Sequence, residues 1–534
     1  MFALALALGA CAAPPPAPCE NVSLAAPAAS PSASASAASA SGKKGSLEVV
    51  PLSAATRRLV ASTLTDELRI DAYVSRDFAP KAFVAALQGT LDQYQAATFE
   101  RGAERAKSRA RCEMHTLLND AVDRREAINR GFSERPLVTD DVERVDLRRG
   151  FIGVEVTYKG KKEAIAWVPP DDITSLEFFL DMKIRELLAL TEGAKIPIGI
   201  VTRGGLSPLA ETNLYPRQPS VTLGGIFAQY APFYELTDVD LATEAPLAEM
   251  PALVVIQQAT AFTELDLAAI DAFLTVGGRT VIVVASSART VIADPRMRAT
   301  SAPSGLEPLL SAYGVELLPQ VIVDPERAFA LDVFAEDGAE RTLHHPLIPV
   351  LGPKDLAPSF EPFRGLGQIP FPFASPLALH PEKQPGAKLS IIGHTSASAT
   401  RASPTAHSFR FDDAAAWSPE GGAAEQPVAV LVEGLIASAF DSEKVSRSNS
   451  RLLVISSSAF LVNPFARAGN PPPMPPQMTM MGPAGGDEKL QAMAAPYSQK
   501  FAKVAIATLL NLLDWSSGNG DFAELTAKLV ATRD

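Results

Sequence analysis

The residues that perform covalent catalysis are few in this chain, and their spacing does not assemble an active site. An amidotransferase or hydrolase needs a cysteine or serine on a sharp strand-to-helix turn, with a histidine partner. Ser286 and Ser287 follow a predicted strand, but they lack the flanking glycines of a Gly-x-Ser-x-Gly motif, and Cys112 lies far from these strands in the sequence. We therefore interpret the two serines as polar strand-end residues and predict that the protein is not an enzyme.

The sequence also predicts no metal or cofactor site. Only His344 and His345 are adjacent among the six histidines, and neighbours in sequence rarely share a metal without further ligands at helical or hairpin spacing. The three cysteines are too few for a disulfide framework or a four-cysteine zinc site. Methionines within residues 474–481 are soft ligands suited to Cu(I), but we favour the interpretation that they belong to a flexible loop without a metal. No Walker A motif occurs, so any ATPase is expected to be another chain.

One short segment is a candidate for binding. Arg203-Gly204-Gly205 directly follows the apolar run of residues 196–201, which we predict to be a strand. Ligands of open α/β sheets bind at the carboxyl ends of parallel strands. We therefore treat this segment as a candidate ligand or partner loop. The alternative is a glycine-rich turn with a solvated arginine.

A βαβ unit is the clearest structural pattern near that loop. Residues 252–256 and 280–285 are apolar apart from Thr280, as is typical of parallel strands that are buried on both faces. Residues 263–274 between them predict an amphipathic helix with acidic residues in its first turn, followed by Gly277. The pattern predicts a doubly covered parallel sheet and an α/β fold.

The same unit predicts part of the protein core. Leu267, Ile270 and Leu274 share one helical face, which we expect to pack on the sheet. Ile256 and Val283 should lie on neighbouring parallel strands. Asp271 follows Ile270 and is expected to face water.

The first 46 residues predict an exported or anchored N-terminus. An apolar run leads to Leu8-Gly9-Ala10-Cys11, which resembles a bacterial lipobox without a basic segment before it. Cys11 is therefore a candidate lipid anchor. The residues that follow are mostly Ala, Pro and Ser, and they predict a disordered tether because they bury too little apolar surface to fold.

Residues 47–194 predict a thioredoxin-like α/β domain. Its expected elements alternate as strand, helix, strand and helix, followed by a further helix, a hairpin and a final helix. The expected strands are 47–50, 68–74, 151–158 and 163–168, and the expected helices are 53–63, 80–98, 117–129 and 174–190. A Cys-x-x-Cys motif is absent, so we expect a structural or interaction copy of this fold.

Residues 195–534 predict a larger domain with further short strands. The expected strands beyond the βαβ unit are 315–324, 389–392, 428–432 and 452–455. A helix is expected at 501–513. Residues of about 463–496 are dense in Pro, Gly and Met and predict a disordered loop.

The charge balance excludes one class of partner. The 48 basic and 60 acidic residues give a formal net charge of −12. Nucleic acid and anionic lipid reward clustered basic residues. We therefore expect no nucleic-acid partner.

Several segments, taken in their order along the chain, resemble the GldG-like auxiliary components of bacterial ABC transport systems, a family first associated with gliding motility. The resemblance covers nearly all of residues 47–534. It is carried by Phe151-Ile152-Gly153-Val154, Tyr158-Lys159-Gly160-Lys161, the Leu-rich helix before Ile198-Gly199-Ile200, the acidic helix before Gly277-Gly278, His345-Pro346-Leu347-Ile348, Pro427-Val428-Ala429-Val430 with Glu433-Gly434, Leu453-Val454-Ile455-Ser456 and residues 511–515.

The resemblance implies a second domain similar to class I glutamine amidotransferases without the catalytic cysteine. It also implies a non-catalytic subunit on the periplasmic side of the cytoplasmic membrane, with a separate ABC permease and ATPase. Members usually carry terminal membrane helices, so anchoring through the N-terminus or through a missing terminal helix is expected. The alternatives are a hydrolase or amidotransferase-like enzyme that acts on an envelope carbohydrate or peptide, and an interaction module of a surface-motility assembly.

Overall fold

The computed structural model describes residues 49–97, 110–118, 120–138, 147–203, 207–211, 213–216, 221–243, 245–246, 248–290, 299–334, 340–404, 420–466 and 488–530. Cys11, the tether, Gly204, Gly205 and the methionine-rich segment therefore lie outside the described residues. Among the described residues, no helix is both long and apolar enough to cross a membrane.

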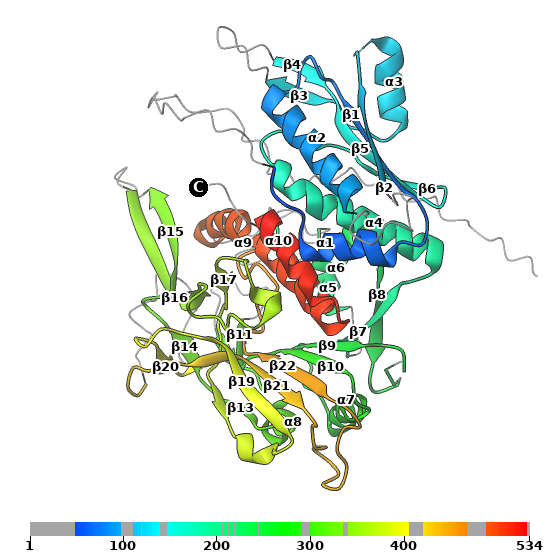
Figure 1. The fold of residues 1–534 in the computed structure, drawn as a ribbon. Coiled ribbons are helices and arrows are strands. Elements are labelled where there is room, and N and C mark those ends of the chain that lie inside the picture. The colour runs from blue at the N-terminus through cyan, green and yellow to red at the C-terminus, as the bar shows by residue number, and fades with distance from the viewer. Residues whose placement is uncertain are drawn as a thin grey trace, which may run out of the picture. The chain divides into compact units, whose positions relative to one another are not determined.

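The first sheet has four strands in the order β2-β1-β5-β6 (Figure 1). They are β1 (Leu68–Val74), β2 (Ala110–Thr116), β5 (Ile152–Tyr158) and β6 (Lys161–Ile165). Strands β1 and β2 are parallel, and the other two pairings are antiparallel. The predicted hairpin is confirmed: Lys159 and Gly160 both have positive φ, 44° and 76°, as a two-residue type I′ turn requires.

The helices expected in this region are present with shifted ends. They are α1 (Ala54–Arg58), which continues as the π-helix η1 (Leu59–Thr63), α2 (Lys81–Ala96), α3 (Ala121–Asn129) and α4 (Leu176–Glu192), preceded by the 3-10 helix η2 (Ile173–Ser175). Ser53 begins α1 because its side chain accepts a hydrogen bond from the Thr56 amide. Helix α4 ends at Gly193, whose φ of 67° is left-handed. Strands β3 (Arg135–Val138) and β4 (Leu147–Gly150) form a separate ribbon.

The strand expected at residues 47–50 is wrong for its described part, since Val49 and Val50 are not in a strand. The second parallel strand of the sheet is instead β2, which the sequence analysis missed. Its sequence, ARCEMHT, has no clean alternation and few β-branched residues. Its parallel pairing with β1 supplies the backbone hydrogen bonds that the local sequence does not indicate. The thioredoxin-like assignment stays a prediction.

The second sheet has seven strands in the order β19-β21-β22-β10-β9-β7-β8. Their bounds are β7 (Ile196–Thr202), β8 (Tyr234–Asp240), β9 (Ala252–Ile256), β10 (Thr280–Val284), β19 (Ala387–His394), β21 (Pro427–Gly434) and β22 (Ser450–Ile455). Five neighbouring strands, from β22 to β8, are parallel, and β21 and β19 continue the sheet antiparallel. The α/β fold class is confirmed, while the similarity to amidotransferases stays a prediction.

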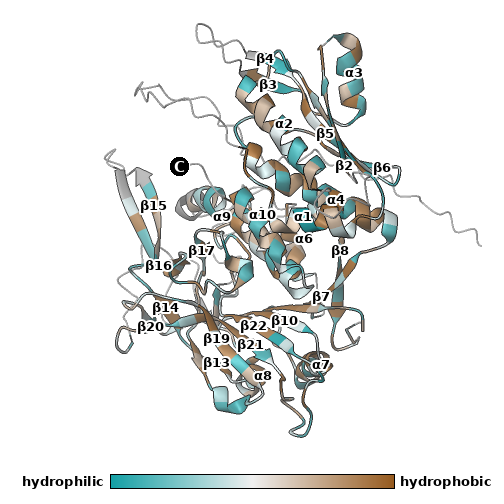
Figure 2. Cartoon of the chain, viewed as in Figure 1, coloured by the Kyte–Doolittle hydropathy of each residue, from teal (hydrophilic) through white to brown (hydrophobic). Residues whose placement is uncertain are grey.

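The βαβ unit is confirmed. Strands β9 and β10 are parallel neighbours, with Val283 opposite Val255 and Ile256 opposite Val284. Every residue of both strands is buried, in agreement with their apolar sequences (Figure 2). Helix α7 (Glu264–Thr275) buries Leu267, Ile270 and Leu274 in the core beneath the sheet, as predicted.

The expectation for Asp271 is wrong. Its side chain is 3% exposed, and its carboxylate accepts hydrogen bonds from the Tyr313 hydroxyl at 2.6 Å, the Ser438 hydroxyl at 2.7 Å and the Ala439 amide at 2.8 Å. The residues that cover it come from beyond helix α8 (Glu307–Ala312) and from the loop after β21. Helical periodicity alone does not reveal this cover, because both segments are distant in sequence.

Short strands and turns lie between β10 and β22. They pair as β11 (Ala288–Thr290) with β12 (Ala299–Ser301), β13 (Val315–Leu317) with β18 (Leu377–Leu379), β14 (Val321–Val323) with β20 (Thr400–Ala402), and β15 (Ala328–Phe334) with β16 (Glu340–Leu351), which also pairs with β17 (Ile369–Pro370). The 3-10 helices η3 (Glu361–Phe363) and η4 (Pro381–Lys383) connect them. The single strand expected at 315–324 is thus two strands with different partners.

The remaining helices are α5 (Pro208–Glu211), α6 (Leu223–Tyr230), α9 (Glu488–Ser516) and α10 (Ala523–Val530), the last preceded by the 3-10 helix η8 (Gly520–Phe522). Helix α9 begins earlier than the expected helix at 501–513 and starts inside the loop expected at 463–496. Pro496 lies within it. At the other end of that expected loop, Asn463 and Phe465 are buried.

Candidate functional site

The strand order of the large sheet contains a topological switch point. The chain places β8 beside β7 on one side and then adds β9, β10 and β22 on the other side. In open α/β sheets, ligands bind outside the carboxyl ends of the strands at such a point, which here lies between β7 and β9. Strand β7 ends at Thr202 and β9 ends at Ile256. Arg203 and the Gln257-Gln258 pair therefore follow the two strands that flank the switch point.

The main chain at Arg203 is held by Gln258. The Arg203 amide donates to Gln258 Oε1 at 2.9 Å, and Gln258 Nε2 donates to the carbonyl of Val201 at 2.9 Å. One side-chain amide thus joins the ends of β7 and β9 through two hydrogen bonds. It fixes the direction in which the chain leaves β7.

The side chain of Arg203 pairs with the first turn of α7. Its Nη1 group donates to Asp266 Oδ2 and, at 3.3 Å, to the Thr263 hydroxyl. Asp266 is fully buried and completes the capping box of α7, since its Oδ2 accepts from the Thr263 amide at 2.6 Å. The Arg203 side chain keeps 16% exposure.

In this arrangement a carboxylate of the chain itself occupies a position that would otherwise favour a bound anion. The amino end of a helix attracts negative charge, and Arg203 adds a cation beside it. Asp266 supplies that charge from within the chain. Within the described residues, Asp266 Oδ1 has no hydrogen-bond partner, and Nε and Nη2 of Arg203 make no hydrogen bond. The pair therefore retains unused hydrogen-bonding groups on both partners.

The serines after β10 are bonded within the chain. The Ser286 hydroxyl donates to the Ala288 carbonyl, and Ser287 Oγ lies 2.7 Å from Ser375 Oγ and donates to the Gln320 carbonyl at 3.2 Å. Both serines are buried. They lead into strand β11 and not into a helix, so the strand-to-helix turn that exposes a nucleophile is not formed at this position.

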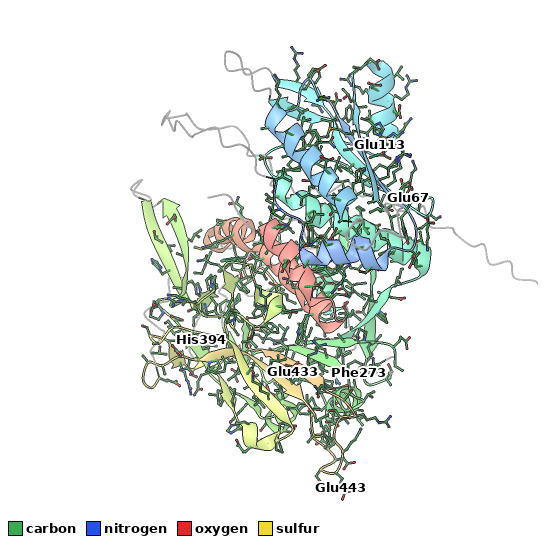
Figure 3. The ribbon with its side chains drawn as sticks, viewed as in Figure 1. Glu67, Glu113, Phe273, His394, Glu433 and Glu443 are labelled. Carbon is green, nitrogen blue, oxygen red and sulfur yellow. The ribbon has the colours of Figure 1, made fainter. Side chains whose placement is uncertain are left out.

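The histidines that the structure describes are spread over several elements. His345 is buried among the aromatic rings of Phe373 and Phe465. His394 lies at the end of β19, whereas Glu113, beside His115, lies on β2 of the other sheet (Figure 3). Burial raises the pKa of the Cys112 thiol to about 12. That shift disfavours the reactive thiolate.

One histidine does lie in a cluster of metal-ligand type, which the sequence analysis missed. Asp71, Glu113 and His115 place one ligand atom each within 4.8 Å of one another. The available indication was the Glu-x-His spacing on a strand, which puts both side chains on one face. However, Arg69 pairs with Asp71 at 2.7 Å and Arg111 with Glu113 at 2.5 Å. These arginines already neutralise the carboxylates, so the cluster fits an ion-pair network better than a cation site.

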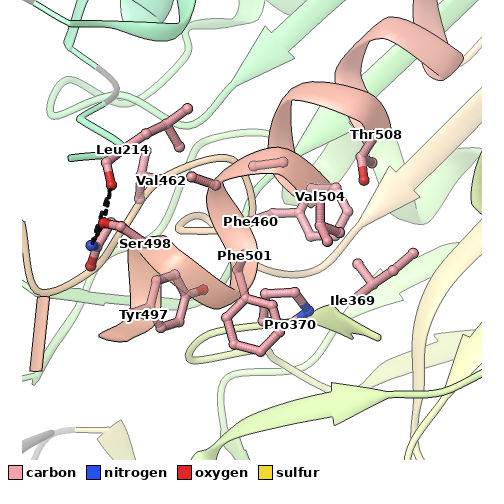
Figure 4. Close-up of a pocket in the computed structure, with 13 residues that line it drawn as sticks. Leu214, Ile369, Pro370, Phe460, Val462, Tyr497, Ser498, Phe501, Val504 and Thr508 are labelled. Carbon is pink, nitrogen blue, oxygen red and sulfur yellow. Dashed lines mark hydrogen bonds between the residues drawn. The ribbon is translucent and has the colours of Figure 1, made fainter. Parts of the chain in front are cut away.

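A small pocket lies beneath α9, near the residues that follow β22 (Figure 4). Its lining is mainly apolar and includes Ile369, Phe460, Phe501 and Val504. Tyr497 Oη and Thr508 Oγ1 also line it, and both are buried without a hydrogen-bond partner among the described residues. Burial raises the pKa of Tyr497. The pocket therefore suits an apolar or neutral group and not a charged one.

One protein-family model matches more than half of the chain. A family model described as an ABC-type uncharacterized transport system matches residues 196–480. The match begins with β7, includes both flanks of the switch point and extends beyond β22. No curated protein matches the chain.

Proposed function

Because the chain belongs to this family of ABC-type transport systems, in which it is an auxiliary component, we propose that it acts as a non-catalytic binding or scaffolding subunit. Its partners are a permease and a separate ATPase. It works on the periplasmic side of the cytoplasmic membrane, anchored through the N-terminus or a terminal helix. The finer relation to GldG-like proteins of gliding motility is part of the same proposal.

The family match over the parallel-sheet region carries this proposal. The geometry of the carboxyl edge supports it. Gln258 and Asp266 occupy the switch point, and the hydroxyls of Ser286 and Ser287 are bonded to the protein itself. Catalysis needs a nucleophile, a base and oxyanion donors around a common point, whereas the two serine hydroxyls at this edge are already hydrogen-bonded within the chain.

Arg203 is the part of this edge that we propose to contact a ligand or partner, together with Gly204 and Gly205. Its guanidinium group retains unused donors beside a partly satisfied carboxylate. Guanidinium groups recognise carboxylates and phosphates through paired hydrogen bonds. The loop therefore suits an acidic or polar surface of a transporter component.

Co-purification of the tagged full-length chain from native membranes tests the subunit role. We expect a permease and an ATPase in the eluate. Arg203→Gln should reduce their recovery, while the matched control Arg364→Gln, at an exposed arginine, should not. An eluate without transporter components would contradict the proposal. Equal recovery with Arg203→Gln and with the wild type would mean that the loop at residues 203–205 does not contact these partners.

Metabolic labelling with a palmitate analogue tests the anchor. The proposal of a lipid anchor predicts that label enters the wild-type chain and not Cys11→Ser. Unchanged labelling in Cys11→Ser would exclude lipidation at that cysteine.

Single substitutions test the enzymatic alternative. Ser286→Ala, Cys112→Ala and His394→Ala should leave transport function near that of the wild type, provided that each variant folds. A loss of several orders of magnitude in any one of them, with stability unchanged, would support an enzyme.

A further inference from the structure

Two carboxyl groups lie one helical turn apart in the interior of the protein. Glu177 and Asp181 are on the same face of α4, and their side chains are among the buried charged groups, at 4% and 1% exposure. Residues four apart on a helix are neighbours. Two ionised carboxylates at this spacing repel one another, and burial strengthens the repulsion.

The hydroxyl of Thr56 bridges the two groups. Thr56 Oγ1 lies 2.6 Å from Glu177 Oε1 and 2.7 Å from Asp181 Oδ2. A hydroxyl carries one proton and can donate only one hydrogen bond. If both carboxyls were ionised, one of these short oxygen contacts would have no proton between its atoms. The geometry therefore requires that one carboxyl group is protonated and donates to Thr56.

The hydrogen-bond partners identify which carboxyl carries the proton. Glu177 accepts from the Ser53 amide at 2.7 Å and pairs with the ammonium group of Lys528, so its charge is compensated. Asp181 Oδ1 accepts only the neutral hydroxyl of Tyr94, at 2.8 Å. If Asp181 Oδ2 carries the proton, it donates a hydrogen bond to Thr56 Oγ1. The Thr56 hydroxyl can then donate its own proton to Glu177 Oε1.

The charged groups around Asp181 agree with this assignment. From α4 itself, Glu177 repels a charge on Asp181 and Arg185 favours one, but Arg185 is hydrogen-bonded to Asp514. From α10, Lys528 is bonded to Glu177 and to the Pro51 carbonyl. From α2, Tyr94 supplies an uncharged donor. Burial is the largest influence and raises the pKa of Asp181 from 3.8 to about 7.

We propose that Glu177 and Asp181 form a buried proton-binding site, and that its single proton stabilises the contacts of two remote segments with α4. The segments are residues 51–56 before and within α1, and helix α10. They meet at this site through Ser53, Thr56 and the Lys528 ammonium group, which bonds both Glu177 and Pro51. Loss of the proton places two carboxylates against one hydroxyl and loosens both segments. The inference does not depend on the proposed role in transport.

The direction of the pH effect follows from linkage. The folded protein keeps the proton on Asp181 up to a pKa of about 7, whereas the unfolded chain loses it near 3.8. The folded state therefore binds more protons between these values, and the contribution of this group to stability falls as pH rises from about 4 to about 7. Above that range its contribution is constant.

Asp181→Asn mimics the protonated site. The amide oxygen can accept from Tyr94, and the amide nitrogen can donate to Thr56. We expect the urea midpoint of the wild-type full chain, measured relative to this variant, to decrease from pH 5 to pH 8. The control Asp66→Asn, at an exposed carboxyl, should follow the wild type. Parallel pH profiles of the wild type and Asp181→Asn would overturn the proposal.

Two further measurements do not rely on global unfolding. Infrared spectra of the wild type should contain a carboxylic acid carbonyl band at pH 6 that disappears by pH 9, and Thr56→Val should alter its titration because the bridging hydroxyl is lost. Hydrogen exchange, corrected for intrinsic rates, should accelerate between pH 6 and pH 8 in residues 51–58 and 523–530 of the wild type. A missing acid band at pH 6 would exclude the proton.

Discussion

Two arginine–aspartate pairs in this protein have the same chemistry and different surroundings. Arg185 and Asp514 join helices α4 and α9, with Nη2 and Oδ1 2.5 Å apart and side-chain exposures of 8% and 1%. Arg203 and Asp266 join the end of β7 to the first turn of α7, and the arginine keeps 16% exposure. The first pair lies in the core, whereas the second lies at the switch point of the sheet.

The two pairs differ mainly in the groups that surround them. The guanidinium carbon of Arg185 lies 4.0 Å and 4.6 Å from the ring centroids of Phe233 and Phe522, and Tyr234 also donates to Asp514. Asp266 instead lies at a helix amino end, where the Thr263 amide and the helix dipole stabilise its charge in addition to the arginine. We therefore expect the core pair to contribute more to stability than the edge pair, whose aspartate keeps other partners at the helix amino end.

The largest expected effect is that of Arg185→Met. The substitution leaves Asp514 buried without its cation, and breaking a buried pair in this way costs about 3–5 kcal/mol. Urea unfolding of the full chain measures the loss. The double variant Arg185→Met/Asp514→Asn should recover part of it, because the uncompensated charge is gone. A loss below about 1 kcal/mol for Arg185→Met would show that the core pair is not special.

Asp271→Ala should have the next largest effect. It removes the acceptor of three hydrogen bonds and leaves the Tyr313 hydroxyl, which is also buried, without its partner. We expect a loss of about 2–3 kcal/mol in the free energy of unfolding. Glu264→Ala, at an exposed acid on the same helix, is the control and should change stability by less than about 1 kcal/mol. Equal effects of Asp271→Ala and Glu264→Ala would support the original expectation that Asp271 faces water.

These residues show what the sequence predicts and what it does not. Apolar runs predicted β9, α7 and β10, because parallel strands are buried on both faces, and the position after β7 predicted that Arg203 lies at the carboxyl edge. The partners of Asp271 and Asp181 come from remote segments: Thr56 and Asp181 are 125 residues apart. Strand β2 was missed because its pairing, and not its composition, makes it a strand. The position of Gln258 at this edge could have been predicted from the sequence, since Gln258 follows β9 as Arg203 follows β7.

Arg203→Gln should cost less than Arg185→Met. Asp266 keeps its hydrogen bonds from the Thr263 amide and hydroxyl, at 2.6 Å and 2.7 Å, and the helix dipole favours its charge. We expect a loss of about 1–2 kcal/mol, near that of a charge-assisted hydrogen bond. Thermal and urea unfolding measure this loss. A cost equal to that of Arg185→Met would mean that the edge pair is as important to folding as the core pair, and that the contrast drawn between the two pairs is wrong.

The smallest effect should have the opposite sign. Both arginine pairs show buried polar groups that are stabilised by partners, whereas the buried Thr508 hydroxyl has none among the described residues. Valine has nearly the same shape and a similar helix propensity, so Thr508→Val removes the desolvation cost of an unpaired hydroxyl. We expect a gain of about 1 kcal/mol in urea unfolding. Thr526→Val is the matched control: its equally buried hydroxyl donates to Asn511 at 2.7 Å, so the same change should destabilise the protein. If both variants were destabilised alike, the Thr508 hydroxyl would have a partner in solution, such as a water molecule in the pocket beneath α9.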